Sequence, residues 1–76
     1  MIRENLIFDL SKLKGRIVEK YETYTAFADR LGISSQQLSP KLNGKTAITK
    51  EDIVEWCELL DISRDEIGVY FFALKV

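Results

Sequence analysis

A pattern of six residues occurs three times along the chain. An apolar residue is followed by Ser or Thr, two polar residues, a polar side chain that can reach back, and a second apolar residue. The Ser or Thr can cap a helix N-terminus, and the two apolar residues can pack together across that cap. The three copies span residues 33–38, 48–53 and 62–67, and they predict helices that begin at about Ser35, Lys50 and Arg64.

Two more helices are predicted ahead of these starts, at about residues 10–21 and 24–31. In both segments apolar residues recur every three or four positions, which is the spacing of one helix face. Thr23 can cap the second helix, and Gly32 can end it in the left-handed conformation that often follows a helix. The two apolar faces consist of Leu10, Leu13, Ile17 and Tyr21, and of Tyr24, Phe27, Ala28 and Leu31.

The helix that begins near Lys50 is predicted to extend to about Leu60, with one buried and one solvated face. Ile53, Cys57 and Leu60 form the buried face, with Trp56 beside them. Cys57 is interpreted as a small core residue rather than a reactive thiol. The solvated face consists of Lys50, Glu51, Asp52, Glu55 and Glu58.

The two ends of the chain, residues 6–8 and 69–76, are rich in residues that favour β-structure. We expect extended segments that either pair as a short two-stranded ribbon within one chain or donate a strand to a second subunit. Gly68 would then end a short fifth helix. A helical alternative also fits the apolar spacing of Ile67, Phe71 and Leu74.

Composition narrows the class of protein. The 76 residues are 46% apolar and include four Gly and one Pro, which predicts one folded domain over residues 1–76. The sequence has no membrane-length apolar run and no signal peptide, and its single cysteine suits a reducing cytoplasm. Because histidine is absent, zinc sites and histidine-dependent catalysis are excluded. We expect an all-α, compact five-helix protein that is located in the cytoplasm. We do not expect it to be an enzyme, and we expect it to bind no cofactor, membrane or small-molecule substrate.

The net charge of −1 is unevenly distributed along the chain. Residues 1–50 contain nine Lys or Arg and five Asp or Glu, whereas residues 51–76 contain two and seven. A basic first two-thirds suits a surface that faces phosphates. Chance unevenness in a small domain is the alternative explanation.

Residues 23–43 have the features of a helix-turn-helix, whose second helix enters the DNA major groove. Ala28 allows the two helices to approach, Gly32 supplies the turn, and Ile33 and Leu38 hold the second helix. The first turn of that helix is left polar and can hydrogen-bond to base edges. The predicted base-reading residues are Ser35, Gln36, Gln37 and Ser39, of which Gln37 ranks lowest because the helix cap can engage it.

Phosphate contacts are predicted around the same motif. A loop with Asn and Gly can present backbone N–H groups, and a neighbouring Lys adds positive charge. Arg16 or Lys20 would add further charge, although each surface cation serves solubility equally well, and Arg30 can equally pair with an acid. The predicted phosphate-contacting residues are Thr23, Tyr24, Thr25, Ser34, Lys41, Asn43 and Lys45.

Residues 23–45, TYTAFADRLGISSQQLSPKLNGK, resemble the helix-turn-helix of Cro/cI-type (xenobiotic-response-element-like) repressors. The whole chain is similar to small lysogeny-control proteins from temperate phages of Gram-positive bacteria. The resemblance implies a repressor-like transcriptional regulator that binds double-stranded operator DNA as a homodimer. The alternative is an antirepressor or modulator that uses the same fold to bind a partner repressor protein. The matching residues are Phe27-Ala28, Gly32-Ile33-Ser34, Leu38-Ser39 and Asn43-Gly44-Lys45.

Two positions depart from the pattern of that family. The family often has Gln where Tyr24 stands, and an apolar residue where Lys41 stands. Pro40 explains the second departure, because a helical proline lacks a backbone N–H and its ring crowds the carbonyl four residues earlier. We therefore expect the helix to kink or end near residues 38–39, with Leu42 as the next apolar anchor.

For the partner-repressor alternative, the second half of the chain supplies negative charge that can meet the basic face of a repressor. The acidic residues are Glu51, Asp52, Glu55, Glu58, Asp61, Asp65 and Glu66.

Overall fold

All three predicted helix starts are helix starts in the computed structural model, which describes residues 8–74. Helix α3 (Ser35–Leu42) begins after the cap Ser34, and α4 (Lys50–Leu60) begins after the cap Thr49. At the third start, Ser63 precedes a 3-10 helix, η1 (Arg64–Glu66), which leads directly into α5 (Ile67–Phe71). At Ser34 and Thr49 the cap and the third residue after it bond reciprocally through their side chains, as the six-residue pattern predicts. At Ser63 the carboxylate of Glu66 accepts from the N–H and the hydroxyl of Ser63, while the N–H of Glu66 donates to the backbone carbonyl of Ser63.

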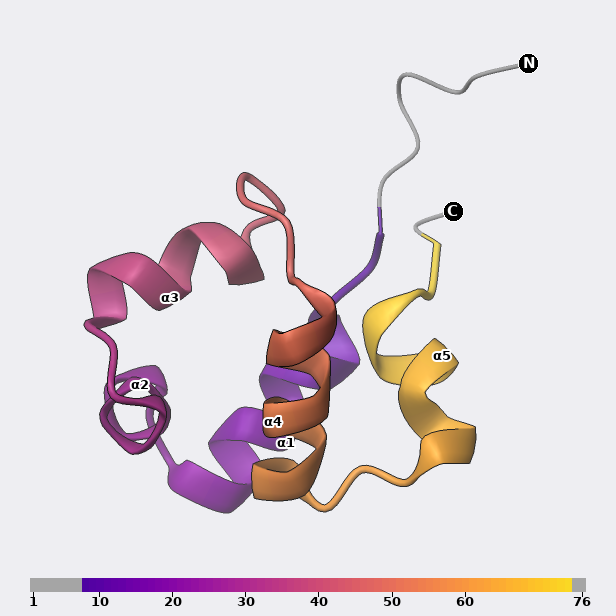
Figure 1. The fold of residues 1–76 in the computed structure, drawn as a ribbon, viewed down its shortest axis with the longest axis horizontal. Helices are drawn as coiled ribbons and strands as arrows, with labels where there is room; N and C mark the ends of the chain where they lie inside the picture. The colour runs from indigo at the N-terminus through magenta and orange to yellow at the C-terminus, as the bar shows by residue number, and fades with distance from the viewer. Residues whose placement is uncertain (1–7, 75–76) are drawn as a thin grey trace.

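The first two helices also lie where the apolar spacing predicts them. Helix α1 (Ser11–Tyr21) is followed by α2 (Tyr24–Leu31), whose cap is Thr23. Gly32 ends α2 with a φ of 79°, in the left-handed region that glycine adopts without strain. The all-α class and the five helices are therefore confirmed for the described residues. In Figure 1, α1 and α4 lie at the centre, α2 and α3 on one side, and α5 on the other.

The core is centred on Trp56, which the sequence placed only beside the buried face of α4. Its indole is 1% exposed and meets the ring of Phe27 edge-on, with centroids 5.4 Å apart. Trp56 and Leu60 face the core, so that Ile53 and Cys57 are only half-buried. Among the described residues, the ten buried apolar side chains are Leu13, Ile17, Phe27, Ala28, Leu38, Leu42, Trp56, Leu60, Ile62 and Phe71.

Tyr24 does not belong to the buried face of α2, contrary to the sequence prediction. Its side chain is 40% exposed. Tyr24 is the first residue of α2, and a helical side chain leans back toward the N-terminus, where no neighbouring element covers it. Phe27 and Ala28 supply the fully buried part of this helix instead.

The β-favouring C-terminal segment is helical as far as Phe71, so the extended prediction for residues 69–71 is wrong. Gly68 lies inside α5 and does not end a helix. The reason is tertiary: as a helix, the segment buries Phe71 against Trp56, with ring centroids 6.2 Å apart. Packing of this kind overrides local β-propensity.

The two terminal segments do meet within one chain, but only as an isolated antiparallel bridge between Phe8 and Leu74. The backbone N–H of Asp9 donates to the carbonyl of Ala73 over 2.6 Å. Residues 6, 7, 75 and 76, which the predicted ribbon also includes, lie outside the described residues. Within residues 8–74, no helix is long and apolar enough to cross a membrane.

Candidate functional site

Helices α2 and α3 present their N-terminal turns at an exposed surface. The hydroxyl of Thr23 accepts a hydrogen bond from the backbone N–H of Ala26 over 3.1 Å, and Ser34 does the same for Gln37 over 3.1 Å. The side-chain oxygen of Gln37 accepts in return from the backbone N–H of Ser34 over 3.0 Å. Gln37 is thus held in the capping box, which agrees with its low rank as a base reader.

The other three predicted base readers separate into two groups. The hydroxyl of Ser39 accepts a 3.3 Å hydrogen bond from the side-chain amide of Asn43, one turn later. Ser35 and Gln36 are exposed, and no hydrogen bond within the described residues engages their side chains. Because they occupy the first two positions of α3, their backbone N–H groups also lack helical partners. Of the four predicted base readers, Ser35 and Gln36 are therefore the two whose side chains have no hydrogen bond within the described residues.

Pro40 does not end α3, which continues to Leu42, so the predicted helix end near residues 38–39 is wrong. Only one hydrogen bond is lost to proline, and Leu38 and Leu42, one turn apart, are both buried and hold the last turn in place. Leu42 is the apolar anchor, as predicted. The carbonyl of Pro40 also accepts two hydrogen bonds, from the N–H groups of Lys45 over 2.9 Å and Thr46 over 3.2 Å.

These bonds change the interpretation of the loop that follows α3. The N–H of Asn43 donates to Ser39 and that of Gly44 to Lys41, while Lys45 donates to Pro40. All three loop amides are therefore directed back at carbonyls of α3, since the end of a helix leaves such carbonyls without helical partners. The N–H groups of this loop are therefore not available to a phosphate, contrary to the prediction, and the exposed side chains of Asn43 and Lys45 are what the loop offers for such a contact.

Lys41 forms an ion pair with Asp52 of α4, with its ammonium 2.5 Å from the carboxylate. The two side chains are 21% and 19% exposed, so the pair is largely shielded from water. Partial burial raises the pKa of Asp52, but the hydrogen bonds from Lys41 and Thr49 outweigh it and hold the pKa below its ordinary value. Lys41 faces α4 because Leu42 takes the core position, and its charge is already compensated.

Arg16 and Lys20 are also engaged, at the C-terminal end of α4. The guanidinium of Arg16 donates to the carbonyls of Leu60 over 2.8 Å and Asp61 over 3.2 Å. Lys20 pairs with the carboxylate of Asp61, which lowers the pKa of that group. These two cations therefore hold α1 against the end of α4. This role could not be predicted from the sequence, because it depends on how α1 crosses α4.

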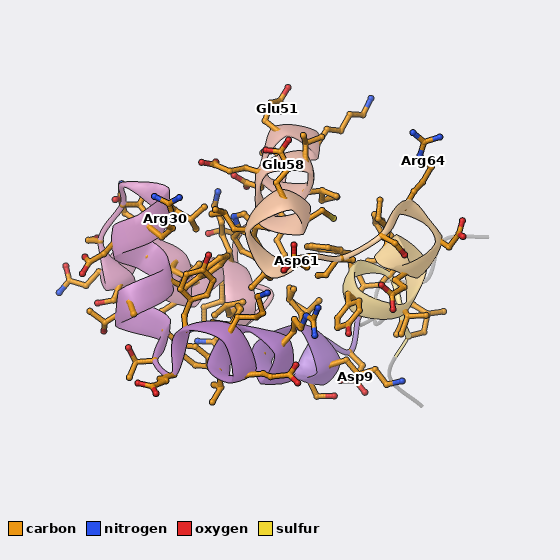
Figure 2. All side chains as sticks on the ribbon, turned by 90° about the horizontal axis from the view of Figure 1, so that it is seen from below. Asp9, Arg30, Glu51, Glu58, Asp61 and Arg64 are labelled. Atoms are coloured by element: carbon orange, nitrogen blue, oxygen red, sulfur yellow. The ribbon has the colours of Figure 1, made fainter. Side chains whose placement is uncertain are left out.

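Little unpaired positive charge remains near α2 and α3. Residues 23–49 contain three cations, Arg30, Lys41 and Lys45, and one acid, Asp29. Lys41 is paired, and within the described residues Arg30 and Lys45 form no ion pair. Figure 2 shows Arg30 projecting outward from α2. The site is therefore polar and weakly basic.

A groove of about 660 Å³ lies on another face, between the start of α1, the loop after α3, and α5. The rings of Phe8 and Phe72 line it, meet edge-on with centroids 5.9 Å apart, and are about half exposed.

Burial raises the pKa of the Cys57 thiol, which agrees with its interpretation as an unreactive residue.

The fold defines a small all-α protein that exposes the N-terminal turns of α2 and α3. The chain belongs to the family described as "Protein of unknown function (DUF739)", which matches residues 6–74. Its structure is similar to the solution structure of the modulator of repression (MOR) of the temperate bacteriophage TP901-1 from Lactococcus lactis. The two share 35% sequence identity over 86% of this chain and 88% of that chain, with a TM-score of 0.77. No curated protein sequence matches the chain.

Proposed function

We propose that the chain regulates phage lysogeny by binding a partner repressor protein, the second of the two functions expected from the sequence. The observation that carries this proposal is the likeness to the modulator of repression of phage TP901-1, which extends over most of both chains. Sequence identity of 35% together with a shared fold supports a shared role in the control of repression.

The charge of the α2–α3 surface also favours a protein partner. Affinity for DNA comes largely from Lys and Arg side chains that neutralise phosphates. Here Lys41 is bound to Asp52, and the loop amides are directed at α3. Arg30 and Lys45 are the cations of this surface that stay unpaired, which is a weak basis for binding DNA alone.

Sequence-specific binding of operator DNA as a homodimer is the second candidate function. Ser35 and Gln36 favour it, because both side chains and both N–H groups stand free at the start of α3. A glutamine can hydrogen-bond to adenine through two atoms, and a helix N-terminus can bind phosphate.

A mobility-shift assay separates the two functions. The probe is the DNA upstream of the gene for this chain, tested with the chain alone and with the repressor encoded beside it. We expect no shift with the chain alone, and altered retardation of the repressor–DNA complex when the chain is added. A sequence-dependent shift with the chain alone would favour the second candidate.

A further inference from the structure

The outer face of α4 is a helix face that no other part of the described chain covers. It consists of Glu51, Val54, Glu55 and Glu58, all of which are exposed. Val54 is 63% exposed, more than any other large hydrophobic side chain in residues 8–74. The four residues line one shallow depression of the surface together with the exposed Lys50, so that the depression has three carboxylates and one ammonium group. Figure 2 shows Glu51 and Glu58 on the part of α4 remote from α1, whereas Asp61 lies close to α1.

The structure distinguishes these carboxylates from three of the four other acids in residues 51–76, and the fourth, Asp65, lies on a different element, η1. Asp52 and Asp61 form ion pairs with lysines, and Glu66 accepts hydrogen bonds from Ser63 at the start of η1. In contrast, no hydrogen bond or ion pair within the described residues engages the side chains of the α4 outer face. Of the seven acids considered from the sequence, three thus share one face with an exposed apolar residue.

This arrangement opposes the stability of the helix that carries it. Glu55 lies four residues after Glu51 and three before Glu58, and like charges at these spacings repel each other. Glu58 is near the C-terminus of α4, where the helix dipole disfavours negative charge, and the last turn has no basic residue. Features that act against local stability are expected where a surface serves binding.

On the basis of the proposed function, we propose that the α4 outer face binds the DNA-contacting face of the partner repressor. A repressor must present Lys and Arg side chains there in order to bind phosphates. Three unpaired carboxylates complement such a face, and Val54 among them provides an apolar contact that DNA does not offer. A repressor bound in this way has its phosphate-binding cations occupied, so it cannot bind its operator at the same time.

The test compares two double variants of the full chain that change the net charge equally. Glu55→Gln/Glu58→Gln alters the α4 outer face, and Glu19→Gln/Glu22→Gln alters two exposed acids at the C-terminal end of α1. Binding to the neighbouring repressor is measured by calorimetry at two salt concentrations. We expect the first variant to bind about tenfold more weakly, with a smaller effect of salt, and the second to bind like the unmodified chain. Val54→Ala should also weaken binding.

A loss of folding does not explain the expected result, because removal of the like charges should leave the thermal unfolding temperature unchanged or slightly higher. If the unmodified chain binds the repressor and both Glu55→Gln/Glu58→Gln and Val54→Ala bind equally well, this inference is wrong while the proposed function stands. If the unmodified chain does not bind the repressor, both are wrong. A variant that changes only self-association of the chain would assign the face to a second copy and overturn the inference.

Discussion

Gln36 and Gln37 are neighbours of the same residue type on an exposed helix, yet they have different roles. The side chain of Gln37 is bound to the N–H of Ser34, whereas that of Gln36 is bound to no described residue. The spacing of Gln37 from Ser34 already predicts this difference, because the third residue of a helix is the one that reaches the cap. The engagement of Ser39 by Asn43 could not be predicted in the same way, since it depends on the course of the chain beyond Pro40.

We expect Gln37→Ala and Gln36→Ala to affect different properties. Gln37→Ala removes one half of the capping box and should lower the free energy of unfolding by about 0.5–1 kcal/mol. Gln36→Ala should leave stability within about 0.5 kcal/mol, because its side chain is exposed and forms no hydrogen bond within residues 8–74. Urea unfolding monitored by circular dichroism measures both. Equal losses would show that Gln36 also has a structural role.

The Lys41–Asp52 pair should make stability depend on pH. The pKa of Asp52 is lowered in the folded chain, so the pair stabilises the fold above the ordinary carboxyl pKa. The contribution is lost as the pH falls through the lowered pKa. We expect Lys41→Met to cost about 1–2 kcal/mol at pH 7, between the values typical of exposed and buried pairs, and much less near pH 2.

A double-mutant cycle with Asp52→Asn isolates the interaction between the two side chains from the capping role of Asp52. The coupling free energy should be present at pH 7 and disappear in acid. A coupling that is the same at both values of pH would exclude the ion pair as its source.

At the scale of elements, local signals predict helix starts better than they predict the ends of the chain. The starts of α3, α4 and η1 follow from bonds between residues three apart, so the sequence contains all the partners. For residues 69–71 the sequence favours an extended segment and leaves a helix as the alternative, but their helical conformation is decided by the contact of Phe71 with Trp56, from another helix. The conformation of the loop after α3 also could not be predicted from local signals. Its N–H groups bond to carbonyls of α3 whose positions depend on that helix continuing past Pro40.

We expect Pro40→Ala to stabilise the chain. Alanine restores the N–H that bonds to the carbonyl of Gln36 and removes the crowding by the ring, at the cost of a more flexible unfolded chain. The net change in the free energy of unfolding should be a gain of about 1–2 kcal/mol, measured by urea unfolding. A loss of stability would mean that the fixed φ of proline is required to hold its carbonyl toward Lys45 and Thr46.

At the scale of the whole molecule, α1 connects to the other helices through its polar residues as well as its apolar face. The guanidinium of Arg16 donates to the backbone carbonyls of Leu60 and Asp61. The hydroxyl of Tyr21 donates to the backbone carbonyl of Leu59 over 3.1 Å. These carbonyls at the end of α4 have no partners in their own helix. Side chains of α1 therefore supply the hydrogen-bond donors for the carbonyls at the C-terminal end of α4.

Arg16→Met should destabilise the whole fold rather than α1 alone. The substitution keeps much of the apolar stem but leaves two carbonyls without their donor, so we expect a lower free energy of unfolding. Thermal unfolding, monitored both by circular dichroism and by fluorescence of Trp56, should shift to lower temperature in one transition. Two separate transitions would contradict a direct connection between the halves.

The bridge between Phe8 and Leu74 closes a loop that contains every helix of the chain. Contacts of such large sequence separation require the most loop-closure entropy, and this one orders few residues in return. We therefore expect it to form last during folding and to open first in native-state hydrogen exchange. The N–H of Asp9, which donates to the carbonyl of Ala73, should exchange faster than the amides of α4. During refolding, protection of this N–H from exchange should appear after protection of the helices.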